Sequence, residues 1–144
     1  MVDRPMTTDP RAALDRLAAS RFRGSFELFG RERDQLRRDG IERVMRHARV
    51  LLEERLAPAR PPRDGRQTPW RGHPVFIAQH ATATCCRSCL ERWHGMSRDV
   101  PLSDEQLDRA LALIRGWLEL QVGDEHGTRP PPSGLTRQLD LLED

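Results

Sequence analysis

The stretch IERVMRHARVLLEERL, residues 41–56, decides the fold class of this chain. Its apolar residues recur at intervals of three and four, which places them on one face of an α-helix and leaves the arginines and glutamates off that face. The stretch therefore predicts an amphipathic helix whose apolar face packs on a core. Gly40, just before it, interrupts the helical pattern that starts at Arg31 or marks the junction of two helices.

A second amphipathic helix is predicted over residues 103–121. Ser103 and Gln106 form an S-x-x-Q capping box, in which each side chain bonds the backbone N–H of the other residue at the start of a helix. Apolar residues follow at helical spacing, and Gly123 is a suitable helix end. Two such helices predict that one core is built mainly between helices.

Weaker patterns lie before and between these helices. The alternating run SFELF, residues 25–29, predicts a short strand. The apolar run PVFIA, residues 74–78, predicts a buried strand or an extended segment. Residues 86–94 predict a short helix that ends at Gly95, and the Pro-rich residues 57–72 predict a long loop. Taken together, these helix, strand and loop patterns predict a small, mainly helical α+β domain with a His/Cys-rich central segment.

The length of 144 residues fits one domain with loose ends. Residues 1–19 are predicted to be a flexible N-terminal tail, within which residues 11–19 can form a short helix after an Asp-Pro start. Residues 20–123 form the predicted globular domain. Residues 124–144 are predicted to be a Pro-rich, largely disordered C-terminal tail, with a short docking turn at 139–142.

Composition narrows the class of protein. The net charge of +2 gives no strong field over the whole molecule for nucleic acid or membrane, so any basic patch is local. All 24 basic residues are arginine, which indicates a bacterial genome of high GC content. The first 19 residues carry charges throughout, unlike a signal peptide, and no apolar run is long enough to cross a membrane. These features predict a cytoplasmic protein.

A metal site is predicted within residues 73–94, which hold three His and three Cys. Thiolates and imidazoles are the preferred ligands of Zn²⁺, which takes four of them in a tetrahedron. Cys86 and Cys89 have the two-residue gap of a thiolate pair that grips one ion. The predicted zinc ligands are His80, Cys86, Cys89 and His94, with His73 and Cys85 in reserve.

Other interpretations of the same segment stay open. On an unbroken helix, Cys89 and His94 project about 140° apart, so His94 would have to lie on a frayed last turn or be replaced by His73 or Cys85. The three Cys can instead be small buried apolar residues, or Cys86 and Cys89 can be a reactive dithiol. A zinc knuckle, with Asp99 as fourth ligand, is a minor option. A zinc deaminase is excluded because Thr82 stands where its general acid/base Glu belongs.

Arginines and tryptophans surround this segment, and such a mixture can hold phosphates and stack bases. The predicted contacts are Arg66, Trp70, Arg71 and Gln79, whereas Trp93 is expected in the core. The leading functional hypothesis is therefore a zinc-binding protein that contacts nucleic acid or nucleotide phosphates. A metal-dependent hydrolase is the alternative, although carboxylates that can act as a base are scarce in the segment. A metal-free interaction protein with buried cysteines is the third.

Residues 73–94, HPVFIAQHATATCCRSCLERWH, resemble the uncharacterised bacterial family catalogued as domain of unknown function 4186. The resemblance starts at Arg66 and extends more loosely from about Phe22 to Trp117. It implies a single small mixed domain and places the functional centre in this segment. It implies no particular activity or substrate.

Overall fold

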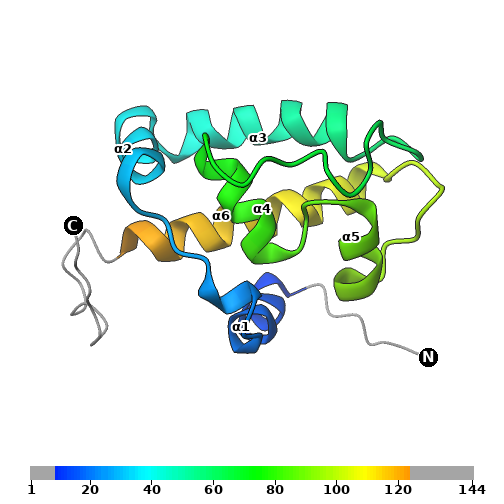
Figure 1. Ribbon diagram of the computed structural model, residues 1–144, viewed down its shortest axis with the longest axis horizontal. Helices are drawn as coiled ribbons and strands as arrows, with labels where there is room; N and C mark the ends of the chain where they lie inside the picture. The colour runs from blue at the N-terminus through cyan, green and yellow to red at the C-terminus, as the bar shows by residue number, and fades with distance from the viewer. Residues whose placement is uncertain (1–8, 124–144) are drawn as a thin grey trace.

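The computed structural model describes residues 9–123. These residues form six α-helices and one short 3-10 helix: α1 (Pro10–Ala19), η1 (Arg23–Ser25), α2 (Gly30–Asp39), α3 (Ile41–Arg55), α4 (Pro74–Thr82), α5 (Arg87–His94) and α6 (Asp104–Gly123). Figure 1 shows α4 between α3 and α1, with α5 and α2 at opposite ends of the molecule. The longest helix, α6, contacts α1, α3 and α4. The core therefore lies between α6 and these three helices.

The two predicted amphipathic helices are confirmed. Gly40 separates α2 from α3 and has a φ of 83°, a conformation that glycine adopts without a Cβ clash. The capping box at the start of α6 forms as predicted, because Ser103 N–H donates to Gln106 Oε1 and Gln106 N–H donates to Ser103 Oγ. The apolar faces of both helices enter one core, whose fully buried members include Val44, Ala48, Leu52, Leu56, Ala110, Ile114 and Leu118.

The strand or extended segment predicted at residues 74–78 is wrong, because these residues begin α4. The His73 side chain caps this helix, since its Nδ1 accepts a hydrogen bond from Val75 N–H at 3.1 Å, and Pro74 occupies the first turn. Almost every side chain of α4 is buried. A helix that is apolar on all sides has no stripe in its sequence, and a short run of it resembles a buried strand.

The strand predicted at residues 25–29 is also absent. Residues 26–29 are extended, but Leu28 N–H donates to the side chain of Gln121 on α6 rather than to a neighbouring strand. The described residues 9–123 contain no β-strand. The mainly helical part of the fold-class prediction is confirmed, and the β part has no counterpart in this region.

The short helix predicted at residues 11–19 forms as α1. Asp9 caps it by accepting from Arg11 N–H at 3.0 Å, and Pro10 stands in its first turn. Because α1 packs on α6, the helical domain continues on the N-terminal side of residue 20. The rest of the predicted N-terminal tail, residues 1–8, and the C-terminal tail with its docking turn lie outside the described residues. Over the described range, no helix has the length and apolarity needed to cross a membrane.

Candidate metal centre

Three cysteine side chains meet where α4 gives way to α5. Residues 83–85 join the two helices, and Ala83 turns the chain in a left-handed conformation with a φ of 59°. Cys86 is the N-cap of α5 and Cys89 lies in its first turn. The Sγ atoms of Cys85, Cys86 and Cys89, here called the thiol cluster, all lie within 4.8 Å of one another.

The spacing of these sulfurs suits a single metal ion. Sγ of Cys86 lies 3.5 Å from Sγ of Cys89. Two thiolates on a tetrahedral zinc ion, each about 2.3 Å from it, are about 3.8 Å apart. Among the described residues no imidazole or carboxylate joins the three sulfurs at this spacing. The cluster therefore offers three soft sulfur ligands to a thiophilic ion. The structure thus bears out the prediction that the cysteines of this segment can share one metal ion.

Arg23 supplies a positive charge to the thiol cluster. Its Nη2 lies 3.1 Å from Sγ of Cys89, and its Nη1 lies 3.7 Å from Sγ of Cys85. Nη1 also donates to the backbone oxygen of His80 at 2.7 Å, which fixes the guanidinium beside the sulfurs. A guanidinium held this way favours a thiolate over a thiol.

The three sulfurs do not share charge equally. Hydrogen bonds donated by the thiols of Cys85 and Cys86, together with Arg23, hold the pKa of Cys89 far below its ordinary value, against the opposing effect of burial. The same contacts with Cys86 and Cys89, together with burial, raise the pKa of Cys85. These contacts therefore favour a thiolate at Cys89 and a protonated thiol at Cys85.

The imidazole of His80 lies close to the thiol cluster but faces elsewhere. Its Nε2 is 3.2 Å from the carbonyl oxygen of Thr68 and 3.1 Å from that of Pro69, so this nitrogen carries the proton. The ring stacks on Trp70 with 3.9 Å between centroids. Burial lowers the pKa of His80 and keeps the ring neutral.

His94 and His73 are also engaged by backbone or by another imidazole. Nε2 of His94 donates to the carbonyl oxygen of Thr82 at 2.7 Å, which ties the end of α5 to the end of α4. His73 caps α4 through Nδ1, and its Nε2 lies 3.1 Å from Nδ1 of His47. Of the predicted ligands and reserves, the structure thus brings together Cys85, Cys86 and Cys89 and leaves the three imidazoles apart.

The loop of residues 57–72 is held against α5 by protein contacts. Oδ1 of Asp64 accepts from Arg87 N–H at the start of α5 and from the side chain of Gln67. Thr68 Oγ1 donates to the carbonyl oxygen of Cys85 at 2.8 Å. The loop therefore docks next to the thiol cluster through its own hydrogen bonds.

The four residues predicted to contact a ligand have different surroundings. Arg66 is exposed, and Trp70 is 58% exposed although one face lies on His80. Arg71 is paired with the buried carboxylate of Glu32 at 2.9 Å. Gln79 is buried and donates to the backbone oxygen of Thr84 at 2.9 Å, so it braces the turn before the cysteines. Arg66, Trp70 and Arg71 are exposed, and of these Arg71 already has a carboxylate partner, whereas Gln79 is buried.

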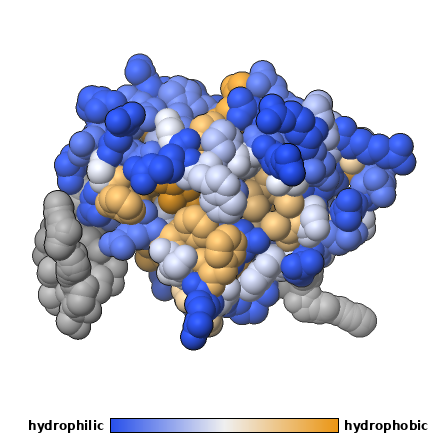
Figure 2. Space-filling view, viewed as in Figure 1, coloured by the Kyte–Doolittle hydropathy of each residue, from blue (hydrophilic) through white to orange (hydrophobic). Residues whose placement is uncertain are grey.

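Trp70 belongs to an aromatic cluster that the sequence did not reveal. Phe22 and Phe26 lie 6.3 Å and 6.2 Å from it, measured between ring centroids, and Phe22 is 50% exposed. In the view of Figure 2, hydrophobic side chains gather near the middle of the molecule, with hydrophilic ones around them. The aromatic cluster of Phe22, Phe26 and Trp70 flanks the thiol cluster, since Arg23 follows Phe22 in the chain and reaches the sulfurs.

Arg23 is the functional residue that sequence reasoning missed. It lies 66 positions before Cys89, and its local sequence contains no signal that links it to the cysteines.

No solved structure matches this chain. The family described as domain of unknown function (DUF4186) matches residues 11–119, which include every helix residue from Arg11 onwards up to the last turn of α6, and the chain belongs to this family.

Proposed function

We propose that this protein is a zinc-binding protein in which the thiol cluster holds the ion. The observation that carries the proposal is the convergence of three sulfur atoms within 4.8 Å, one of them already favoured as a thiolate. Thiolate ligands select zinc and other thiophilic ions over the hard cations magnesium and calcium. This proposal takes Cys85 as the third ligand in place of His94, and it leaves the fourth position to water or to His80.

A water molecule or the imidazole of His80 fills the fourth position in this proposal. His80 is favoured over His94 because the Arg23 guanidinium contacts both the carbonyl oxygen of His80 and the sulfurs. His80 and the sulfurs therefore lie on the same side of the site. The ring would have to release the carbonyl oxygens of Thr68 and Pro69 to reach an ion. Water needs no such change, and an ion that keeps a bound water is open to further ligands.

The test is the metal content of untagged full-length protein purified without chelator. We expect about one zinc per chain in the wild type, as one site of this kind requires. The Cys86→Ser/Cys89→Ser double variant should contain no zinc. The Ser88→Ala variant, changed between the two cysteines, should keep it. Zinc that persists in the double variant, or wild type without metal after reconstitution under reducing conditions, would overturn the proposal.

Cobalt substitution reads the ligand set. Co²⁺ bound by three thiolates gives strong sulfur-to-cobalt charge-transfer absorption, which should weaken in the Cys85→Ser variant if Cys85 is a ligand. The His80→Asn variant separates the two candidates for the fourth position. An unchanged cobalt spectrum favours water, and a shifted d–d band favours His80. These spectra also bear on the hydrolase alternative, which needs the water-bound form.

A second candidate function is contact with nucleic acid or nucleotides through the aromatic cluster. Its support is that Trp70 and Phe22 are 58% and 50% exposed, because bases stack on aromatic rings of this kind. Arg66, four positions before Trp70 in the sequence, is exposed. Binding of a labelled single-stranded oligonucleotide should weaken as salt rises and weaken further in Trp70→Ala. The exposed Val50→Ala variant, on α3, is the control. Equal binding by both variants would remove this candidate.

We place the protein in the cytoplasm. All three cysteines are free, and the predicted use of reduced thiols suits a reducing compartment. The third hypothesis, a metal-free interaction protein, is what remains if neither zinc nor a nucleic acid binds.

A further inference from the structure

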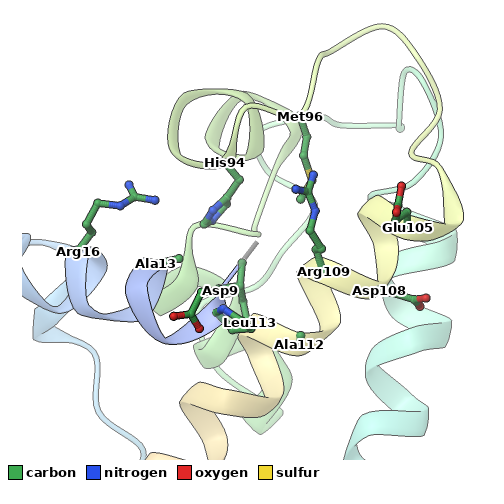
Figure 3. A pocket seen from close by; sticks show the side chains of 11 residues that line it. Asp9, Ala13, Arg16, His94, Met96, Glu105, Asp108, Arg109, Ala112 and Leu113 are labelled. Carbon is green, nitrogen blue, oxygen red and sulfur yellow. The ribbon is translucent and has the colours of Figure 1, made fainter. Parts of the chain in front are cut away.

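A separate pocket is lined in part by His94 and by none of the cysteines of the thiol cluster. It is formed between α1, the end of α5 and α6, and is called here the helix pocket. Its volume is about 210 Å³. Most of the surface exposed inside it is apolar, and Ala13, Met96, Ala112 and Leu113 are among the residues that line it. Figure 3 shows the imidazole of His94 among the side chains that line it.

Two guanidinium groups reach the helix pocket from opposite sides. Arg16 extends from α1 and Arg109 extends from α6, and both side chains point toward the region of His94 in Figure 3. Neither forms a hydrogen bond or ion pair with any residue between 9 and 123. Nε of Arg109 is buried and has no hydrogen-bond partner in this part of the chain. A buried N–H without a partner is uncommon in folded proteins and calls for an acceptor.

The carboxylates around the pocket are turned away from these guanidiniums or already paired. Asp9 accepts from Arg11 N–H as the cap of α1. Asp108 is paired with Arg49 on α3 at 2.9 Å. Glu105 lies at the rim, and in Figure 3 its carboxylate points away from His94. The acceptor that Arg16 and Arg109 lack is therefore not supplied by the pocket's own acidic residues.

The size and lining of the pocket define the rest of the ligand. An apolar cavity of about 150 Å³ accommodates benzene, so about 210 Å³ leaves room for one ring or a short aliphatic chain with a carboxylate attached. Apolar walls with a few converging polar groups are the usual form of small-molecule sites. A guanidinium selects a planar anion, because it can donate two parallel hydrogen bonds to a carboxylate. Arg16 and Arg109 both line this pocket and carry such a group.

We propose that the helix pocket binds a small amphipathic monocarboxylate, whose carboxylate is held by Arg16 and Arg109 and whose apolar body lies against Ala13, Met96 and Leu113. This site is independent of the thiol cluster and does not require zinc. Occupancy of the pocket joins α1 to α6 through an anion.

Titration of the full-length protein with benzoate and with hexanoate, followed by the amide chemical shifts in ¹H–¹⁵N NMR spectra, tests this assignment. The perturbed amides should map to α1, residues 94–96 and α6. Benzyl alcohol, of similar size and uncharged, should bind at least about tenfold more weakly, because the charge-assisted hydrogen bonds are lost. Benzylamine, which is cationic, should not bind at all.

Three variants assign the residues. Arg109→Gln and Arg16→Gln should each weaken benzoate binding by about tenfold or more. Arg11→Gln, also on α1 but outside the helix pocket, should bind as the wild type does. Ala112→Leu should abolish binding by filling the pocket, while its melting temperature shows that the fold is intact.

Three results would overturn the proposal. The first is that neither carboxylate binds the full chain, and the second is that benzyl alcohol binds as well as benzoate. The third is that carboxylates bind only after residues 1–8 are removed, which would assign the pocket to the chain's own N-terminal segment. Since zinc content is measured separately, failure here leaves the proposed metal function untouched, and the reverse also holds.

Discussion

Nη2 of Arg23 lies 3.1 Å from Sγ of Cys89, although the two residues are 66 positions apart in the chain. The same guanidinium reaches Sγ of Cys85 and the carbonyl oxygen of His80. One side chain from η1 therefore connects the N-terminal part of the chain to the thiols and to α4. Its charge acts on the sulfurs before any ion is bound.

Replacing Arg23 should change the chemistry of the thiols. In zinc-free Arg23→Gln protein we expect a higher pKa for Cys89, because the guanidinium that favours its thiolate is gone. The pH dependence of iodoacetamide alkylation, read site by site by mass spectrometry, measures this. Zinc affinity should fall by about 10- to 100-fold, the usual cost of losing a residue that supports metal ligands. The exposed Arg21→Gln variant is the control, and an unchanged alkylation profile in Arg23→Gln would contradict the prediction.

Arg87 should be among the most costly residues to replace. It is 1% exposed and donates to the carbonyl oxygens of Pro58, Ser97 and Val100 at 2.6–2.8 Å. Arg87→Met leaves these buried acceptors unpaired, and we expect a loss of about 3 kcal/mol or more in the free energy of unfolding. Urea denaturation measures the loss. Arg92→Met, exposed on the same helix, should stay within about 0.5 kcal/mol of the wild type.

Glu32 should stabilise the fold as a carboxylate. Burial alone would raise its pKa, but the N–H of Gly72 and the guanidinium of Arg71 outweigh burial and hold the pKa below its ordinary value. A pKa lowered by folding gives stability that is present at neutral pH and is lost as pH falls through the folded-state pKa. Glu32→Gln should cost about 1–3 kcal/mol at pH 7 and less in acid. An equal loss at both pH values would contradict the role of its charge.

His94 should make the protein less stable in mild acid. Burial lowers its pKa, so the folded protein keeps the ring neutral while the unfolded chain takes up a proton near pH 6.5. Stability is therefore full above the unfolded-state pKa and declines as pH falls below it. In zinc-free protein, the stability difference between about pH 7.5 and about pH 5.5 should shrink in His94→Gln, whose amide can still donate to Thr82. The same difference in both proteins would show that His94 does not titrate on unfolding.

The sequence was sufficient to predict a helix, a junction or a cap wherever the pattern that specifies it is local. The stripe in α3, the Gly40 junction, the Ser103–Gln106 capping box and the end of α5 at Gly95 each depend on neighbours within a few residues, and each is confirmed. α4 was not recognised because burial on every side removes its periodicity. The N-cap of α4 is His73, a residue that the sequence predicts as a reserve zinc ligand.

The candidate site was predicted only in part for a related reason. Cysteine spacing indicated a shared site, and the structure gathers all three sulfurs. Whether a histidine joins them depends on the backbone carbonyl oxygens that its ring meets, and these come from Thr68, Pro69 and Thr82, which lie 11 or 12 positions away from the rings. Arg23 depends on a contact across more than 60 positions. Contacts at such separations follow from the packing of helices and leave no trace in local spacing.

The many carbonyl contacts of Arg87 have a kinetic consequence. This one side chain joins the first turn of α5 to the chain on both sides of it, near residues 58 and 97–100. Segments joined in this way open together as one cooperative unit, so their slowest amide hydrogens should exchange at a common rate. Cys86 directly precedes Arg87, and Cys89 lies in the same helical turn. An ion held there would leave only as fast as this unit opens.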